Sequence, residues 1–220
     1  MPEQSHRAYI MPDIIAGLHH AATQPKEGRS VLAGIALDRR GLLAAADGFL
    51  LVVRKPDFKD GITWDGDPFS AIIPHVVAKT KLDKNCPIIV DAIALTVTFT
   101  PHKGEHMTMP LVQGTFPRWE ALIPSVTPES KNDLGTFNPD ILSQARKAMG
   151  NPNVLRLFAL DKRSPAVAIT EQNDGSYTSL AVIMPMYTET FTAQDVTAGI
   201  ASFVAPVIAE PETAADPVTA

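Results

Sequence analysis

The sequence predicts an α+β protein in which helices pack on one face of antiparallel sheets. Two observations predict this class. A unit made of a short strand, a helix and three further strands occurs three times, and the predicted elements carry their apolar residues along one side. Helices and sheets of this kind bury their apolar faces against each other. A chain of such units favours a curved assembly over a compact enzyme with a single pocket.

The predicted helices come from three segments that resemble one another, 8–22, 70–81 and 135–148. In each segment a short extended stretch meets a proline, and apolar residues then recur at i, i+3 and i+4. Pro12, Pro74 and Pro139 are nearly evenly spaced along the chain. We expect each proline in the first turn of its helix, where its missing N–H costs no hydrogen bond. The spacing therefore predicts one helix in each unit.

Three β-like runs, rich in Val, Ile, Thr and Leu and bounded by turn residues, follow each helix. They are 31–38, 42–46 and 49–54, then 87–90, 94–100 and 105–114, then 154–160, 166–170 and 177–184. The last two strands form a predicted hairpin that turns at Asn173-Asp174-Gly175. Segments 55–68 and 124–134 are predicted linkers. The repeat ends at Tyr187, and the Ala/Pro/Glu/Asp/Thr-rich end of the chain is expected to be disordered.

Composition limits the classes of function. The net charge of −5 argues against a protein that coats DNA or an anionic membrane over its whole surface, although a local basic face is compatible with it. The single cysteine, Cys86, rules out an internal disulfide framework and a cysteine-built zinc site. No signal segment is recognisable, and no apolar run approaches the ~20 residues of a membrane span. We therefore expect a cytoplasmic protein without a membrane partner.

Signals of enzyme chemistry are weak. His102 and His106 have helical spacing, but Lys103-Gly104 between them predicts a turn, so two aligned metal ligands are not expected. Asp47, in Ala-Asp-Gly, is interpreted as a turn residue. The sequence has no Gly-rich phosphate loop and no nucleophile elbow, and Cys86 is expected to be a buried small hydrophobe. We predict no catalytic residue, no metal site and no cofactor.

Four stretches of the chain resemble the bacterial DNA polymerase III beta subunit family, the sliding clamps. They are 42–53 (LLAAADGFLLVV), 69–79 (FSAIIPHVVAK), 111–124 (LVQGTFPRWEALIP) and 181–187 (AVIMPMY). They are similar to the family's TDG-x-x-L strand turn, its strand-Pro-helix, its interdomain linker and its C-terminal V-V-M-P-M. The resemblance implies a DNA clamp fold, in which each domain is two copies of the repeated unit.

Bacterial clamps carry six units in three domains, whereas this chain carries three units. The resemblance therefore implies a complete clamp-like domain at 1–124, a half domain at 125–190 and a C-terminal extension at 191–220. A family ring holds twelve units, so four copies of this chain would supply that number. Three units also leave a sheet edge and an apolar face unpaired, and we expect a homo-oligomer.

In the family, helices lining the hole offer Lys and Arg to DNA phosphates through loose contacts. The resemblance implies weak, non-specific binding of duplex DNA. The matching residues in this chain are Lys79, Lys81, Lys84, Arg146 and Lys147. The first helix carries only His19 and His20 instead. The alternative interpretation is that these cations are solvated and favour the C-terminal turns of their helices.

The family also binds a short peptide of polymerases and repair proteins in an apolar groove between two domains. The resemblance implies that this groove would use Ala46, Gly48, Leu50, Leu51, Pro117, Ala121, Leu122, Asn138, Ile141, Pro165, Val182, Met184, Pro185 and Met186. We expect the floor from Leu51, Pro117, Leu122, Ile141 and Met186, and a polar rim contact from Asn138. For Met184 and Met186, plain strand packing is the alternative.

The chain departs from the family pattern at two points of this groove. Phe49-Leu50 stands where clamps commonly have His-Arg, and Tyr187-Thr188 replaces a terminal Arg-Leu.

The resemblance implies a sliding-clamp-like processivity factor that tethers a DNA polymerase or other clamp-binding proteins to DNA. The alternative function is a clamp-derived peptide-binding adaptor, or a competitor of the replication clamp, that does not encircle DNA. The size of the protein in solution separates the two.

Overall fold

The computed structural model describes residues 5–23, 30–56, 61–124, 135–161, 163–171 and 177–186. The chain divides into two compact units, Met1–Met186 and Tyr187–Ala220, and every described residue belongs to the first. The predicted turn at 173–175, nearly all of the predicted linker 124–134 and the extension 191–220 lie outside the described residues.

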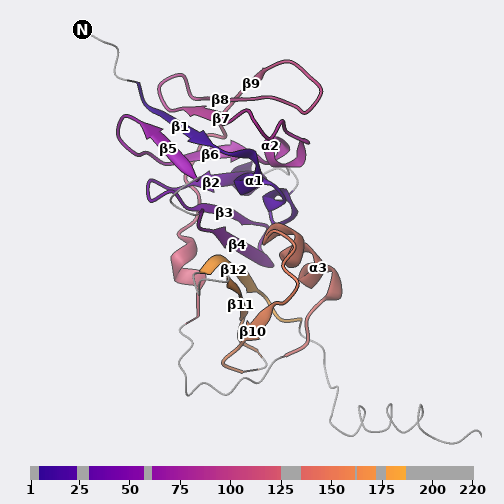
Figure 1. Cartoon of the computed structure of the whole chain (residues 1–220). Helices are drawn as coiled ribbons and strands as arrows, with labels where there is room; N and C mark the ends of the chain where they lie inside the picture. Colours follow the sequence, from indigo (N-terminus) through magenta and orange to yellow (C-terminus); the bar gives the residue numbers. More distant parts are fainter. Residues whose placement is uncertain are drawn as a thin grey trace, which may run out of the picture. The chain divides into compact units, whose positions relative to one another are not determined.

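The strands in the described part of the chain form two antiparallel sheets (Figure 1). The five-stranded sheet has the order β5-β1-β7-β8-β9, with β5 at Ile62–Asp65, β1 at Arg7–Ile10, β7 at Ile88–Asp91, β8 at Thr96–Phe99 and β9 at Met107–Pro110. The seven-stranded sheet has the order β10-β11-β12-β4-β3-β2-β6. Its strands are β10 at Arg156–Phe158, β11 at Ala166–Glu171, β12 at Tyr177–Ile183, β4 at Leu50–Arg54, β3 at Leu43–Ala46, β2 at Gly34–Leu37 and β6 at Ala71–Pro74.

Three α-helices match the three repeated segments: α1 at Pro12–Ile15, α2 at His75–Lys79 and α3 at Pro139–Ala148. Three 3-10 turns accompany them: η1 at Leu18–His20, η2 at Ser30–Ala33 and η3 at Trp119–Leu122. The α-helices lie along one side of the sheets (Figure 1), which agrees with the predicted layer architecture.

The predicted lengths of the first two helices are wrong. After α1 the chain turns at Gly17, whose φ of 85° belongs to the left-handed region that ends helices. A Cβ at Gly17 would lie 2.6 Å from the carbonyl oxygen of Lys147, so this turn also lets α3 approach closely. The second helix ends where Thr80 becomes extended. Pro74 is the last residue of β6 and precedes α2, whereas Pro12 and Pro139 begin their helices as predicted.

Strand β5 was also missed, because it lies inside the predicted linker 55–68. It pairs with β1 over four residues, from Ile62 opposite Ile10 to Asp65 opposite Arg7. Its residues alternate between half-buried and exposed, as in an edge strand that is covered on one face. Trp64 on this strand packs edge-on against Phe69, with ring centroids 5.2 Å apart.

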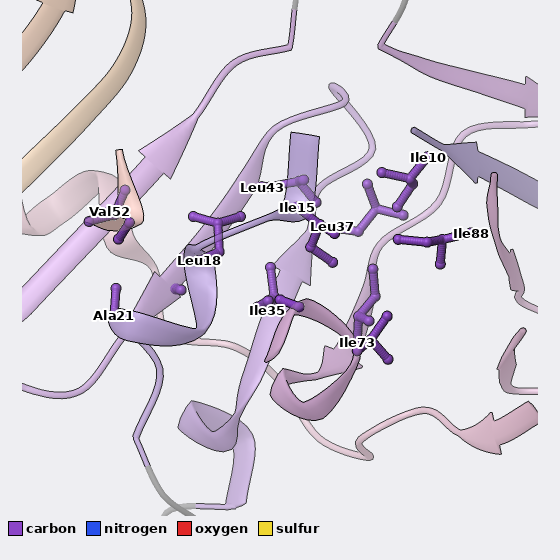
Figure 2. Packing of buried hydrophobic residues seen from close by; sticks show 14 of the residues in the cluster. Ile10, Ile15, Leu18, Ala21, Ile35, Leu37, Leu43, Val52, Ile73 and Ile88 are labelled. Carbon is purple, nitrogen blue, oxygen red and sulfur yellow. The ribbon is translucent and has the colours of Figure 1, made fainter. Parts of the chain in front are cut away.

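The main core lies between the helices and the sheets. Figure 2 shows Ile10 and Ile88 from the five-stranded sheet beside Leu37 and Ile73 from the seven-stranded sheet. Leu18 of η1 is also fully buried in this core. Each such side chain contributes about 1.5–3 kcal/mol of burial free energy, so the core joins both sheets and the helices into one unit.

A second apolar cluster covers the opposite face of the seven-stranded sheet. Its buried members are Ala36, Ala44, Ala46, Leu51, Val53 and Val182. Phe116, Trp119 and Ile123, from the segment that includes η3, pack over them. Strands β2, β3 and β4 are therefore buried on both faces, so they are continuous apolar runs rather than alternating ones.

Candidate peptide surface and basic cavity

The pairing of β4 with β12 joins the first and third repeats. Leu51 lies opposite Val182, and Leu50 lies opposite Ile183. Beyond the paired strands, the Met184 N–H donates to the Phe49 carbonyl oxygen (2.9 Å) and the Met186 N–H donates to the Thr136 carbonyl oxygen (2.8 Å). Predicted groove residues more than 130 positions apart in the sequence thus come together on two central strands of the seven-stranded sheet.

The predicted groove residues divide between the two faces of this sheet. Ala46, Leu51 and Val182 belong to the cluster beneath the η3 segment, where Leu51 is only 3% exposed. Leu50 is buried in the main core, and Ile141 of α3 packs against that core from the helix side. The expected floor residues therefore do not share one surface.

The remaining groove residues differ in their exposure. Gly48, Pro117, Ala121 and Leu122 are exposed, whereas Pro165 and Pro185 are half-buried. Asn138 directly precedes α3, and its side-chain oxygen accepts the Asp140 backbone N–H (2.8 Å), as an N-cap residue does. The expected contact of Asn138 at a groove rim stays a prediction.

Phe49 is an apolar surface residue that the predicted groove left out. The Asp47 carboxylate accepts the backbone N–H groups of Phe49 (2.8 Å) and Leu50 (2.9 Å), and Gly48 has a φ of 99°. This turn leaves the Phe49 side chain 61% exposed. The sequence showed that an aromatic residue follows Asp-Gly where clamps commonly have histidine, but it did not show that this side chain is exposed.

Phe49, Leu122, Met184 and Met186 form what we call the peptide surface. All four are large apolar residues that remain exposed, and Met186 is 45% exposed. Met184 and Met186 directly follow β12, and the half-buried Pro185 stands between them in sequence. Leu122 belongs to η3, and its neighbour Ile123 packs on the cluster that contains Leu51 and Val182.

The five predicted DNA-binding residues are all exposed and belong to α2, α3 and the segment after α2. Three of them, Lys81, Lys84 and Lys147, line one cavity of about 410 Å³ together with Arg54. We call this the basic cavity. Lys79 and Arg146 lie outside its lining, and the Arg146 Nε donates to the Pro152 carbonyl oxygen (3.0 Å).

Arg54 is a buried cation, only 8% exposed. Its guanidinium donates to the backbone carbonyl oxygens of Ile14 (2.7 Å), Ala16 (3.0 Å) and Ala148. Removal from water lowers the pKa of Arg54 to about 10, so the group stays protonated at neutral pH. The side chain connects β4 to the carbonyl ends of α1 and α3.

His19 and His20 of η1 stack with ring centroids 4.0 Å apart. The pKa of His19 is lowered, first by desolvation and then by the neighbouring His20. Desolvation, followed by the charge of Lys147, lowers the pKa of His20. Both imidazoles are therefore mainly neutral at pH 7, and the first repeat adds no charge from these positions.

Within the described ranges, no group of three or more His, Cys, Asp or Glu could hold a metal ion. His106 Nδ1 lies 2.7 Å from the Thr100 hydroxyl, and Asp47 is a turn residue, as predicted. Cys86 is half-buried rather than buried. None of the helices in the same ranges has the length and apolar character needed to cross a membrane.

The architecture is that of a DNA clamp, with repeated units whose helices cover one face of antiparallel sheets. Three solved structures with the same architecture are bacterial DNA polymerase III beta clamps. The Helicobacter pylori clamp bound to a DNA ligase peptide has a TM-score of 0.62 and 13% identity, over 86% of this chain and 67% of that chain. The Streptococcus pyogenes beta subunit has a TM-score of 0.61 and 14% identity, over 86% and 67%.

The Pseudomonas aeruginosa sliding clamp has a TM-score of 0.59 and 18% identity, over 86% of this chain and 69% of that chain. No protein-family model matches the sequence, and no curated protein matches it. The likeness therefore shows the clamp fold, across about two thirds of the length of each clamp.

Proposed function

We propose that the chain is a sliding-clamp-like DNA polymerase processivity factor in the cytoplasm. It tethers replication or repair proteins to DNA through the peptide surface and carries out no chemistry itself. The observation that carries this proposal is the β4–β12 pairing, because Phe49 directly precedes β4 and Met184 and Met186 directly follow β12 at the same end of this strand pair. The η3 segment packs on the cluster that contains Leu51 and Val182 of these strands. A solved clamp of the same fold holds a DNA ligase peptide.

Exposed Met and Phe side chains suit such a partner. Methionine is flexible and polarisable, so it adapts to varied apolar side chains, and aromatic residues anchor small interfaces. A short peptide that buries one or two apolar side chains binds with an affinity around micromolar. Duplex DNA is the second partner, held weakly and without sequence preference by the cations on the helix side.

The number of repeats favours one alternative function, a clamp-derived adaptor or competitor that does not encircle DNA. The chain spans about two thirds of a clamp chain and carries three units. A chain that stays monomeric would keep the peptide surface without a ring, and would act as an adaptor or as a competitor of the replication clamp.

Peptide titration tests the proposal. A short fluorescent peptide that ends in leucine and phenylalanine is titrated with wild type, Met186→Ala and Leu122→Ala. Loss of a true anchor costs about 2 kcal/mol, so each variant should bind about thirtyfold more weakly. Met107→Ala is the matched control, because Met107 is 51% exposed on β9, away from the peptide surface. No binding by wild type, or equal binding by all variants, would contradict the proposal.

A further inference from the structure

We propose that the basic cavity binds a phosphate group. The cavity lies between α1, the segment that follows α2, and the C-terminal end of α3. Its volume of about 410 Å³ is ample for a phosphate and part of the molecule that carries it. The inference rests in part on the proposed function, because a duplex DNA backbone is one source of such a phosphate and a free polyphosphate is the other.

The charges that line the basic cavity are strongly unbalanced. Lys81, Lys84, Lys147 and Arg54 contribute four positive charges, and Asp13 contributes the single carboxylate. In the part of the chain that the structure describes, none of the three lysines forms an ion pair. Like charges around a concave surface raise the local potential and attract an anion. A bound phosphate would relieve the mutual repulsion of the three ammonium groups.

Arg54 adds a fixed charge that solvent screens weakly. It is more than nine-tenths buried and is held by backbone carbonyl oxygens. A Cβ at Gly150, which has a φ of 93°, would lie 3.7 Å from the terminal guanidinium nitrogen. Gly150, which has no side chain, therefore forms the cavity wall beside the guanidinium. An anion at this wall interacts with the buried charge through a low-dielectric environment, where Coulomb attraction is stronger than in water.

The lysine side chains of the basic cavity indicate that phosphate is the class of anion it binds. Lysine presents a compact charge on a flexible stem and binds phosphate as a point charge, whereas planar two-point recognition of a carboxylate is the strength of an exposed arginine. Three lysines from two separate segments converge on the cavity, and Arg54 is already occupied by carbonyl groups. A multiply charged phosphate fits this arrangement better than a single carboxylate.

The inference separates the five exposed cations of this face into two classes. Lys81, Lys84 and Lys147 should act together on one phosphate, whereas Lys79 and Arg146 should contribute only to the general field. Non-specific attraction alone predicts that all five are equivalent. The difference allows a test with variants of equal charge.

The experiment compares Lys81→Gln/Lys147→Gln with the control Lys79→Gln/Arg146→Gln in the full chain. Each double variant removes two positive charges from exposed positions, one in or just after α2 and one in α3. The probes are inorganic tripolyphosphate, measured by calorimetry, and a fluorescent 20-base-pair duplex, measured by anisotropy over a salt series. Circular dichroism and thermal melting check that both variants fold like the wild type.

The cavity variant should lose tripolyphosphate binding by about tenfold or more, while the control changes less than about twofold. Duplex affinity falls as the salt concentration rises. The slope of log affinity against log salt should become less steep by about one for each cavity lysine removed. If tripolyphosphate binds through the cavity and the duplex does not bind, the inference stands and the DNA part of the proposed function fails.

Two other results overturn the inference. If the duplex binds and both double variants weaken it equally, DNA binding is general and the cavity has no special role. If wild type binds neither probe, there is no phosphate site. Lys84→Glu adds a second check, because a reversed charge at the cavity should abolish tripolyphosphate binding if the site exists.

Discussion

Arg54 shows how one residue can join repeats that are distant in sequence. It stands at the end of β4, and its guanidinium reaches carbonyl oxygens of α1 in the first repeat and of α3 in the third. Carbonyl groups at helix C-termini have no partner within the helix and carry partial negative charge. A buried cation satisfies several of them at once, and this compensates for its removal from water.

Replacing Arg54 with methionine should therefore destabilise the protein. The apolar side chain keeps some of the packing but leaves the carbonyl oxygens of Ile14, Ala16 and Ala148 without their donor. Buried polar groups without partners cost about 1–3 kcal/mol each, and after relaxation we expect a net loss of about 3 kcal/mol. Urea unfolding measures this change.

Arg39→Met is the control for Arg54→Met, because Arg39 is exposed in the turn after β2. A surface substitution of this kind changes stability by less than about 0.5 kcal/mol. Equal stability of the two variants would show that the bonds from Arg54 do not support the fold.

At the scale of elements, η1 packs between α2 and α3 and carries two histidines in a partly buried stack. Because the pKa values of His19 and His20 are lowered in the folded state, the unfolded chain takes up protons first as the pH falls below about 6.5. The stabilisation from the neutral imidazoles is thus present above that pH and is lost on acidification.

We expect the melting temperature to fall between pH 7.5 and pH 5.5, and to fall less in His19→Gln/His20→Gln. His102→Gln is the control, since His102 is exposed between β8 and β9. The pKa of Asp91 is also lowered, first by the backbone N–H of Ala94. Its contribution is lost only below about pH 4, outside this window. An identical pH dependence in wild type and the double variant would disprove a role for η1.

At the scale of the whole molecule, each sheet ends, among the described residues, in strands that pair with another described strand on one side. β9 is an edge of the five-stranded sheet and β10 is an edge of the seven-stranded sheet. Large apolar residues are exposed near both edges: Leu95 and Met107 near β9, and Val154 and Leu160 near β10. Exposed edges with apolar neighbours favour strand addition by another chain.

We therefore predict that the protein self-associates through these edges. Light scattering at tens of micromolar, an order-of-magnitude working range, should give a mass above 23.7 kDa that decreases on dilution. Met107→Lys and Val154→Lys place charges at the edges and should lower the mass, whereas Phe49→Lys, on the peptide surface, should not. A strict monomer would exclude the ring and leave the adaptor function.

Much of the fold was predictable because its signals are local. Pro12 and Pro139 mark helix starts, and the runs of β-branched residues mark the strands of each repeat. The missed features depend on partners elsewhere in the chain. Strand β5 is short and lies among Asp and Gly residues, so its conformation follows from pairing with β1. The early end of α1 at Gly17 reflects the close approach of α3.

The candidate sites were only partly predictable, for the same reason. The sequence named Met184 and Met186 as groove residues, and three of its five basic residues line one cavity. It did not indicate that Phe49 is exposed beside Met184 or that Arg54 is a buried cation. Both facts follow from the β4–β12 register and from helix packing, which no local pattern encodes.

The sequence by itself determined the repeated unit, the α+β class and the positions of most strands, because side-chain periodicity and proline act within a few residues of the chain. Only the tertiary structure decided which face of the seven-stranded sheet each apolar residue occupies, and which cations meet in one cavity. Those outcomes depend on contacts between Leu51 and Val182, or between Arg54 and Ala148, that are far apart in sequence. Such contacts form because burial of the shared core outweighs the entropy of closing the long loops between them.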